Sequence, residues 1–403
     1  MFIDFNSFFA SVEQVCTPRL RGWPVAVVPL RAETTSCIAA SRQAKAAGIR
    51  TGTPVYEARR LCPDLEVVEA RPELYVRCHK RLNEVIAECG VSPEVASIDE
   101  VHCPLWGEWM EVKAAQRLAR RVKDAIAGKV SPILTCSVGL APNRFLAKTA
   151  SDMQKPDGLV TITADDLPDC LHPLALRDLC GVGPRMEARL RARQIDTVEH
   201  LCAASRELLR EVWGGVEGER FHAALHGLQT VARDTTYRSV SHSHILPPAL
   251  RDEAGARSVL HRLTQKAATR LRSMGHLAGA MGVFVRAVAG HPDWSDEVRF
   301  PDTHDTIDLL HALDRMWERR PHGTAAAPLG VGVNLFLLKE EKNASLPLLD
   351  RPQHARQAAL LAVVDRLNLE KKHAVYFGGA HGSLAYTPMR IAFTRIPDPG
   401  TEG

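Results

Sequence analysis

Apolar positions along the first 160 residues recur with two spacings. Short apolar runs, which suit buried strands, alternate with stretches in which apolar residues return every three or four positions, as on one face of a helix. The runs predict strands at 23–29 and 133–140. The periodic stretches predict helices at 43–48, 55–61, 73–89, 109–127 and 145–153. This alternation of strands and helices indicates a compact α/β domain.

The pattern changes near residue 162. From 167 to 228 only short helical stretches occur, and the segment 229–238 is predicted to be a linker. A long helix at 253–274 then precedes a strand, a helix and a strand, which are predicted at 281–287, 307–318 and 331–338. The β-α-β-β-α-β-like order is typical of a small α+β domain. The charges of the long helix are interpreted as facing solvent.

Two acidic stretches mark the first domain. They are FIDFN at 2–6 and ASIDEV at 96–101, and in each of them β-favouring apolar residues lead directly into carboxylates. Read as strands, they turn Asp4 away from its apolar neighbours and place Asp99 on the opposite face from Glu100. The first domain therefore carries three carboxylates at the ends of two predicted strands.

These carboxylates favour metal-dependent chemistry. A carboxylate inside an apolar strand is costly unless it is ionised and paired, and a divalent cation is the usual partner. Hard oxygen ligands without Cys or His nearby suit Mg²⁺ rather than Zn²⁺. The resulting hypothesis is two-metal phosphoryl or nucleotidyl transfer. The simpler alternative is that each aspartate only makes a turn at the end of its strand.

The residues that follow the first acidic stretch extend this hypothesis. Only three residues precede Asp4, so the first strand is either short or begins upstream of this sequence. Asn6 or Ser7 is expected to cap the helix that comes next. Phe8 and Phe9 would then lie beside the carboxylates, and packing into the core is the alternative for both.

Basic residues farther along suggest where phosphates bind. Arg42 and Lys45 can hold a triphosphate, although such residues are more often solvated surface charges. CGVGPR at 180–185 has the pattern of a helix-hairpin-helix loop, in which Gly181 and Gly183 allow close approach of a phosphate backbone. The helix that follows offers free N–H groups, and its arginines are Arg185, Arg189, Arg191 and Arg193. Binding to DNA backbone is favoured over a plain glycine turn.

Composition narrows the classes of protein to which the chain can belong. For 403 residues two to four domains are expected, and the net charge of +4 fits a nucleic-acid partner without requiring one. Ten scattered cysteines without a C-x-x-C pair argue against a zinc ribbon or a secreted disulfide framework, and for a reducing cytoplasm. No apolar run is long enough to span a membrane and no signal peptide precedes the acidic stretch.

Taken together, these stretches resemble the Y-family, or translesion, DNA polymerases. The resemblance covers residues 1–340 in unbroken order. Its most specific parts are DFNSFFASVE at 4–13, SIDE at 97–100, SVGLAPNRFLAK at 137–148, KPDG at 155–158 and GVGP at 181–184.

The resemblance implies an α+β multidomain protein with the right-hand polymerase architecture. The expected parts are a palm at 1–12 and 72–162, fingers at 13–71, a thumb with the helix-hairpin-helix at 163–228, the linker at 229–238, a little finger at 239–340 and a C-terminal tail at 341–403.

Roles for single residues come with the resemblance. Asp4 and Asp99 would bridge two Mg²⁺ ions, Glu100 would bind the ion on the catalytic side, and the Phe5 carbonyl would bind the other. Phe9 falls at the steric gate, which packs under the sugar and excludes a 2′-hydroxyl. The other implied nucleotide-binding residues are Phe8, Ala39, Arg42, Lys45 and Lys155. The implied DNA-binding residues are Gly181, Gly183 and Arg185.

Several positions depart from the common pattern of this family. Asn6 stands where many DinB-type members have Asp and is more similar to UmuC-type members. Arg42 replaces a common Tyr and Lys45 a common Arg, and both retain the capacity to bind phosphate. VHC at 101–103 replaces the more usual Ala-Tyr-Leu after the acidic pair.

The last segment contains two resemblances to partner-binding peptides. SLPLL at 345–349 resembles a sliding-clamp-binding peptide, with Leu346, Leu348 and Leu349 as its contacts. It lacks the leading Gln and the aromatic end, so a turn that starts a helix is the alternative. MRIAFTRIP at 389–397 resembles the tail of UmuC-like and ImuB-like bacterial proteins, which implies a UmuD-like or ImuA-like partner protein.

The expected function is low-fidelity translesion synthesis in a bacterial cytoplasm, in association with the nucleoid. The protein would add deoxynucleoside triphosphates to the 3′ end of primer-template DNA, without proofreading, and Ala39 would form part of a loose roof over the nascent pair. The alternative is an ImuB-like, clamp-bound adaptor for another polymerase. Such adaptors are expected to lack Asp4, Asp99 and Glu100. A palm-type nucleotide cyclase explains neither the helix-hairpin-helix nor the little finger.

Overall fold

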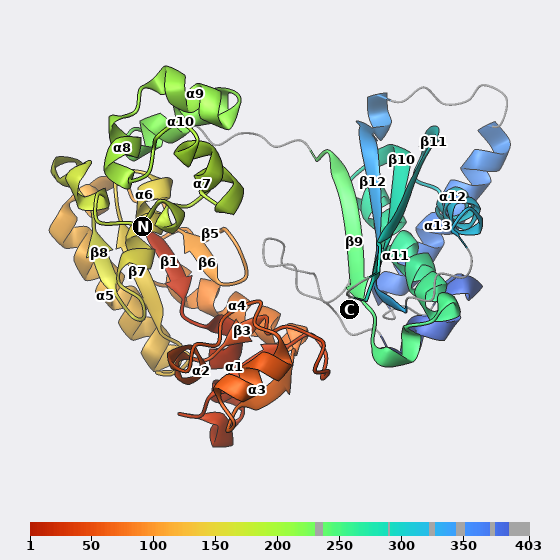
Figure 1. The fold of residues 1–403 in the computed structure, drawn as a ribbon, viewed down its shortest axis with the longest axis horizontal. Coiled ribbons are helices and arrows are strands. Elements are labelled where there is room, and N and C mark those ends of the chain that lie inside the picture. The colour runs from red at the N-terminus through yellow and green to blue at the C-terminus, as the bar shows by residue number, and fades with distance from the viewer. Residues whose placement is uncertain (230–236, 289–290, 322–326, 344–350, 371–374, 387–403) are drawn as a thin grey trace. The chain divides into compact units, whose positions relative to one another are not determined.

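The computed structural model describes residues 1–229, 237–288, 291–321, 327–343, 351–370 and 375–386 (Figure 1). These residues form two compact units, one on either side of the gap at 230–236. Most of the predicted linker falls in that gap. The predicted clamp contacts Leu346, Leu348 and Leu349 and the segment 389–397 also lie outside the described residues. Among the described residues no helix is both long and apolar enough to cross a bilayer.

A five-stranded sheet forms the centre of the first unit. Its order is β5-β6-β1-β7-β8. The middle strand β1 is antiparallel to both of its neighbours, and all four of its residues are buried. The strands are β1 (Phe2–Phe5), β5 (Glu94–Val95), β6 (Glu100–His102), β7 (Cys136–Leu140) and β8 (Leu159–Thr161).

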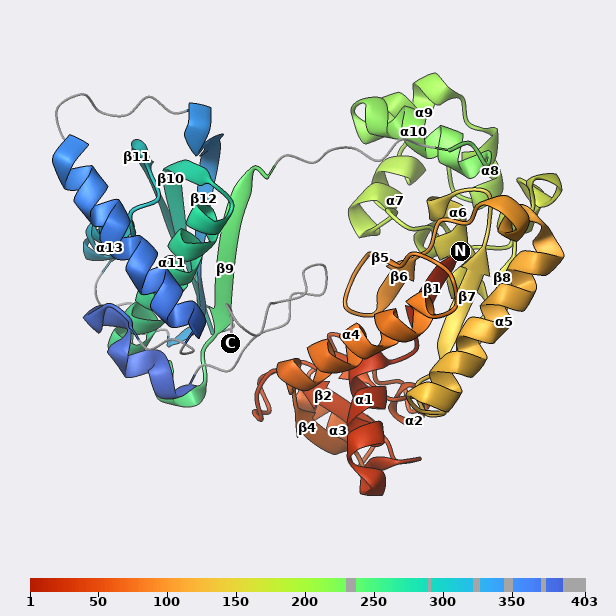
Figure 2. The same ribbon diagram turned by 180° about the vertical axis from the view of Figure 1, so that it is seen from behind.

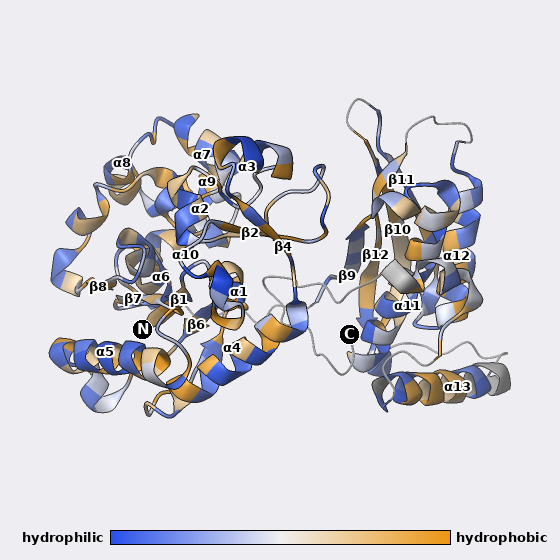
Figure 3. Ribbon diagram, turned by 90° about the horizontal axis from the view of Figure 1, so that it is seen from below, coloured by the Kyte–Doolittle hydropathy of each residue, from blue (hydrophilic) through white to orange (hydrophobic). Residues whose placement is uncertain are grey.

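One face of this sheet is covered by three helices. Ile3 pairs in register with Val101 and Val138, so these three apolar side chains share that face. They belong to one buried core with residues of α1, α4 and α5. The helices are α1 (Phe8–Cys16), α4 (Pro72–Ala87) and α5 (Val112–Lys129), seen from behind in Figure 2. Figure 3 shows polar and apolar residues interleaved round α5, as expected for a helix with one buried side.

The other face carries α6 (Arg144–Met153), which packs very closely on β7. Gly139 permits this approach, because a Cβ there would lie 1.9 Å from the backbone oxygen of Ala147 and 2.5 Å from the backbone nitrogen of Ser151. Asn143 caps this helix, since its side chain accepts a hydrogen bond from Leu146 N at 2.8 Å. The sheet face that bears Asp4 is therefore covered by a helix fixed at short range.

A second sheet and two helices follow α1 in the sequence. The sheet has the order β3-β2-β4 and its own small core. Its elements are β2 (Val25–Val28), β3 (Ala39–Ala40), α2 (Arg42–Ala46), α3 (Val55–Leu61) and β4 (Glu66–Glu69). The helix predicted at 55–61 has these bounds in the structure.

The rest of the first unit contains four short α-helices, as the sequence predicts. They are α7 (Pro184–Arg191), α8 (Val198–Ala203), α9 (Arg206–Trp213) and α10 (Val216–Leu225), and they form a core with residues of α6. Short 3₁₀ helices across the described chain are Pro18–Leu20, Gly107–Met110, Ala164–Asp166, Asp169–Leu171, Leu176–Asp178, Pro248–Leu250, Glu341–Asn343 and Gly378–Tyr386.

The second unit is a four-stranded antiparallel sheet with the order β11-β10-β12-β9, which shares a core with α11 and α12. Its chain order is β-α-β-β-α-β followed by α13. The β-α-β-β-α-β order agrees with the expectation from the sequence, although residues were assigned in advance to only two of the four strands. The elements are β9 (Ser239–Ile245), α11 (Glu253–Ser273), β10 (His276–Ala287), β11 (Trp294–Thr303), α12 (Thr306–Glu318), β12 (Pro328–Glu340) and α13 (Arg351–Glu370).

Two expectations about the long helices α5 and α11 are wrong in detail. The helix predicted to begin at 109 begins at Val112, because Glu111 accepts hydrogen bonds from the two N–H groups of Lys113 and Ala114 and so caps it there. The charges of α11 do not all face solvent. Arg262 is buried, and the Arg272 guanidinium pairs with Asp365 of α13 at 2.7 Å.

Candidate active site

A cavity of about 600 Å³ opens where β1 ends and α1 begins. Its walls come from the 4–11 segment, from β3 and α2, and from the turn at 155–157. It is lined by nine of the residues that the resemblance implicates in metal or nucleotide binding: Asp4, Phe5, Phe8, Phe9, Ala39, Arg42, Lys45, Asp99 and Lys155. Glu100 is not among the lining residues. Residues from four separate stretches of sequence are thus brought to one cavity.

Asp4 is held in this cavity by a lysine. Its cross-strand neighbours in register are Glu100 in β6 and Ser137 in β7, so these three side chains share a sheet face. Burial raises the pKa of Asp4 to about 6, and the ammonium of Lys155, 2.6 Å from Asp4 Oδ2, opposes that rise. Burial disfavours charged Lys155, but Asp4 and Asp152 outweigh it and raise its pKa. One lysine therefore offsets only part of the cost of ionising Asp4.

Asp99 does not lie in a strand, contrary to the sequence expectation. It sits in a bend, and β6 begins at Glu100. Ser97 Oγ donates to Asp99 Oδ1 at 2.6 Å, and this local bond competes with strand pairing. The Asp99 carbonyl accepts from Phe5 N at 2.9 Å, which ties the bend to the end of β1.

A buried histidine supports this bend from α4. His79 Nδ1 donates to the Ile98 carbonyl at 2.9 Å, and its Nε2 lies 2.7 Å from Asn83 Nδ2, so the ring is neutral with the proton on Nδ1. Burial lowers the pKa of His79, which favours the same state. Sequence reasoning missed this residue, and nothing in the α4 sequence distinguishes it from an ordinary helical histidine.

Glu100 is paired with Lys148 of α6. The two side chains are each 23% exposed, and the ammonium of Lys148 also lies 5.2 Å from the centre of the Phe2 ring. Among the described residues no group of three His, Cys, Asp or Glu side chains is arranged to hold a metal ion. Glu100 is therefore placed close to the other carboxylates along the sheet, but its charge is directed to a lysine.

The donor set at the cavity fits a divalent cation. Asp4 and Asp99 line the cavity with carboxylates, whose oxygens are the hard ligands that Mg²⁺ prefers. The raised pKa of Asp4 means that this buried carboxylate lacks full compensation by positive charge. A cation bound beside Asp4 would supply the positive charge that Lys155 alone does not provide.

Phe9 is backed by a buried polar network that the sequence did not predict. Its ring stacks on Tyr75 of α4, with centroids 4.6 Å apart and an interplanar angle of 16°. Tyr75 Oη donates to Glu13 Oε1 at 2.7 Å, and Glu13, fully buried, is also paired with Arg71. The spacing of four residues between Phe9 and Glu13, one helical turn, was the available signal.

The expected side-chain cap at the start of α1 is absent. Ser7 occupies the N-cap position with φ of 50°, in the left-handed region, and its side chain makes no capping bond. Asn6 Oδ1 instead accepts from Asp157 N at 2.8 Å and from Thr135 Oγ1 at 3.1 Å. The amide of Asn6 is used to join β1 to the turn that carries Lys155.

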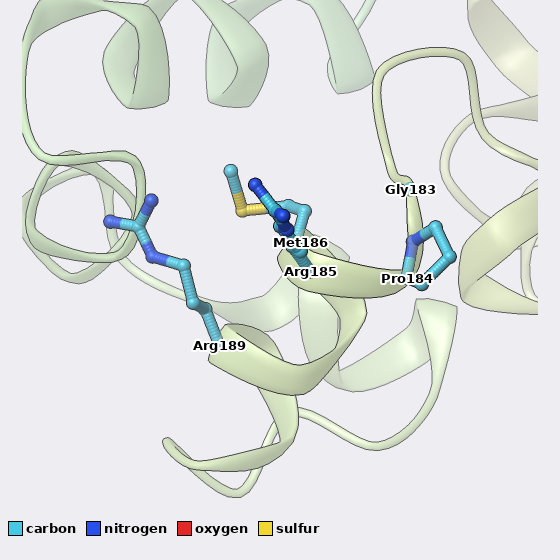
Figure 4. A pocket seen from close by; sticks show the side chains of 5 residues that line it. All are labelled: Gly183, Pro184, Arg185, Met186 and Arg189. Atoms are coloured by element: carbon cyan, nitrogen blue, oxygen red, sulfur yellow. The ribbon is translucent and has the colours of Figure 1, made fainter. Parts of the chain in front are cut away.

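A second cavity, of about 500 Å³, lies at the N-terminus of α7 (Figure 4). It is lined by Gly183, Pro184, Arg185, Met186 and Arg189, and Figure 4 shows the last three projecting from one helix. Gly183 is the N-cap residue of α7. Gly181, with φ of 91°, adopts the left-handed conformation that favours glycine.

Models of protein families match three segments of the chain. The description "impB/mucB/samB family" matches residues 3–152, and its C-terminal domain matches residues 237–348. An IMS family HHH motif matches residues 164–195, which include the α7 cavity. The first match includes most of the residues that line the first cavity.

Curated relatives are similar over nearly the whole chain. DNA polymerase IV of Moorella thermoacetica is 34% identical over 91% of this chain and 92% of its own length. DNA polymerase IV 1 of Bacillus subtilis is 28% identical over 91% of this chain and 89% of its own.

Solved structures share the fold. A Y-family DNA polymerase chimera has a TM-score of 0.67 with 23% identity, covering 83% of this chain and 98% of its own. DinB from Sulfolobus solfataricus has a TM-score of 0.53 with 23% identity, covering 83% of this chain and 97% of its own.

Proposed function

Because the chain belongs to the impB/mucB/samB family and is a DNA-directed DNA polymerase of the Y family, we propose that it extends primers across damaged template bases by a two-Mg²⁺ reaction. The observation that carries this proposal is the shared cavity. Carboxylates, a phenylalanine stack and basic residues from separate segments line one space of nucleotide size. Low fidelity and a role in damage tolerance are parts of the same proposal.

Each wall of the cavity has a task in this reaction. Asp4, Asp99 and the Phe5 carbonyl would hold the ions. Glu100 would also bind an ion once its carboxylate is no longer paired with Lys148. When bound, such ions activate the primer 3′-hydroxyl and neutralise charge on the triphosphate and its leaving pyrophosphate.

The remaining lining residues would select and hold the nucleotide. Lys155, Arg42 and Lys45 would bind its phosphates, and Phe9 would exclude a 2′-hydroxyl. Ala39 offers only a methyl group above the nascent pair, so the shape of the pair is checked loosely. A loose check admits distorted templates and also mismatches.

The α7 cavity is proposed as the contact to the primer-template. Gly181 and Gly183 keep the loop free of side chains, Arg185 supplies positive charge, and the N-terminus of α7 offers free N–H groups. All three features act on phosphates, so the binding would not depend on base sequence.

The last part of the chain is proposed to bind partner proteins. Leu346, Leu348 and Leu349 would bind a sliding clamp, and the last segment a UmuD-like or ImuA-like protein, but both lie outside the described residues. The alternative function, an ImuB-like adaptor, is not favoured. The relatives that match over 91% of the chain carry the name of a polymerase, and Asp4 and Asp99 line the cavity.

Primer extension by the purified chain tests the proposal. With a primer-template, four deoxynucleotides and Mg²⁺, we expect extension that Asp99→Ala abolishes while DNA binding is retained. Extension past an abasic template position is the second expected result. Failure of the unsubstituted chain to extend any primer that it binds would reject the polymerase mechanism for this site. Loss of DNA binding in Asp99→Ala would instead assign Asp99 a structural role.

A further inference from the structure

The turn that carries Lys155 is fixed from behind by Lys123 of α5, which does not line the cavity. Its Nζ donates to the carbonyl oxygens of Asp157 at 2.6 Å, Cys136 at 2.9 Å and Gly158 at 3.2 Å. The same ammonium lies 2.7 Å from Asp157 Oδ1. An ammonium has three N–H donors, and here each has an acceptor on the turn or on the start of β7.

Asn6 holds the same turn from the side of the cavity. Its Oδ1 accepts from Asp157 N at 2.8 Å, and its Nδ2 donates to Ser137 Oγ at 3.1 Å. Ser137 Oγ in turn accepts from Gly158 N at 3.4 Å. Both backbone N–H groups at the end of the turn are therefore bound to side chains of β7 or the end of β1.

The turn itself is too tight to adjust on its own. A Cβ at Gly158 would lie 1.9 Å from the backbone oxygen of Gln154, so the turn folds directly onto the end of α6. Lys155 leaves this turn with its Nζ 2.6 Å from Asp4 Oδ2 and 2.7 Å from Asp152 Oδ1. The position of that ammonium is set by the backbone of the turn.

We propose that Lys123 is a positioning residue for nucleotide binding, because it holds the 155–158 turn so that Lys155 faces the triphosphate. The inference rests on the proposed function, in which Lys155 contacts the phosphates. Lys123 touches no substrate. It acts through Lys155, and a lysine whose backbone has shifted loses an ordered charge-assisted contact.

A double-mutant cycle in the full chain tests this role. Lys123→Met, Lys155→Met and the double variant are compared by the deoxynucleotide concentration dependence of single-turnover incorporation on one primer-template. Each single variant is expected to bind nucleotide about tenfold more weakly, as for one lost charge-assisted contact. The double variant is expected to bind no more weakly than Lys155→Met, because the two residues act in series. A purely structural loss would add to that of Lys155→Met.

Lys129→Met is the matched control. Lys129 lies on the same helix and its ammonium also makes an ion pair, with Glu88 at 2.6 Å, but it does not touch the turn. Its nucleotide affinity should equal that of the unsubstituted protein. Should Lys123→Met not fold, Asn6→Ala loosens the same turn from the other side and should give the same non-additive loss with Lys155→Met.

The outcomes separate the two proposals. The positioning role is overturned if the losses add in the double variant. It is also overturned if Lys123→Met binds nucleotide with unchanged affinity while Lys155→Met binds it more weakly. Both outcomes leave the polymerase proposal intact. Unchanged affinity in Lys155→Met removes the triphosphate role of Lys155 itself, and the positioning role of Lys123 falls with it.

Discussion

Phe9 is buried, stacks on a tyrosine and is one of the residues that line the cavity. Its ring stacks on Tyr75, whose hydroxyl is bonded to the buried Glu13, and it also lines the cavity. In the proposed function, a ring fixed in this way would not turn aside for an extra hydroxyl on the sugar. The rigidity of the gate would come from α4 and from the carboxylate one turn along α1.

Phe9→Ala is therefore expected to admit ribonucleotides. Removal of the ring opens space under the sugar, and the ratio of deoxynucleotide to ribonucleotide kcat/KM should fall by roughly tenfold to a hundredfold, the range for relief of one steric clash. The ratio is measured for ATP against dATP opposite template dT. An unchanged ratio would show that the sugar lies elsewhere.

His79 predicts a pH dependence of stability. Burial lowers its pKa in the folded protein below the ordinary value of 6.5, so the unfolded chain binds the proton first as the pH falls. The stabilisation from neutral His79 is thus complete above pH 6.5 and is lost progressively below it.

The measurement compares the unsubstituted protein with His79→Gln, whose amide can still donate to the Ile98 carbonyl. The difference in free energy of unfolding by urea should be constant above about pH 7 and should shift in favour of the variant as the pH falls towards about 5. A difference that does not change over this range would mean that folding leaves the pKa of His79 unshifted.

Among the elements, the contact between α6 and β7 is the tightest that governs the site. A Cβ at Gly139 meets two backbone atoms of α6 and has no flexible side chain to push aside. Gly139→Ala is expected to destabilise the protein by about 3 kcal/mol, as for overpacking of a rigid core.

Gly128→Ala in α5 is the matched control with the opposite sign. A Cβ there meets nothing within 4 Å, so alanine should stabilise the helix by about 0.5–1 kcal/mol. Chemical denaturation of the two variants measures both changes in the free energy of unfolding. Equal effects of the two substitutions would contradict the close packing at Gly139.

The elements also show where the sequence is informative. α3 and α12 have clear apolar periods, and their predicted bounds agree with the structure to within a residue. β9 was not predicted, because its Ser and His residues give no apolar alternation even though alternate positions are buried. The bend at Asp99 was missed for a different reason: its side-chain bond to Ser97 is local and overrides a strand-like sequence.

The candidate site was predictable to the extent that motifs carried it. Asp4, Phe9 and Lys155 lie together as the resemblance implied. The supporting residues Lys123 and His79 could not be predicted from the sequence. Both bind backbone carbonyls, and the sequence of a helix does not tell which carbonyl a side chain reaches.

At the scale of the whole molecule, the described residues divide into units with separate cores. The core of the second unit is drawn only from residues 240–335, and the first unit contains the other three. No core is shared between the units within the described ranges, so they are expected to unfold in separate transitions.

Leu313→Ala tests this independence. Leu313 is fully buried in α12, and its loss should cost about 3 kcal/mol and lower one calorimetric Tm by roughly ten degrees. Leu82→Ala in α4 should lower another transition and leave the first in place. If either substitution shifts all transitions together, the two units unfold as one.

The close packing of α6 on β7 has a mechanical consequence. Lys148 lies on that helix and Lys155 on the turn that folds onto its end, while Asp4 and Glu100 lie on the sheet. The two ammonium groups thus belong to α6 and the turn after it, and the two carboxylates belong to the sheet. A displacement of α6 along β7 would therefore be expected to change both charge separations, and the close packing at Gly139 opposes such a displacement.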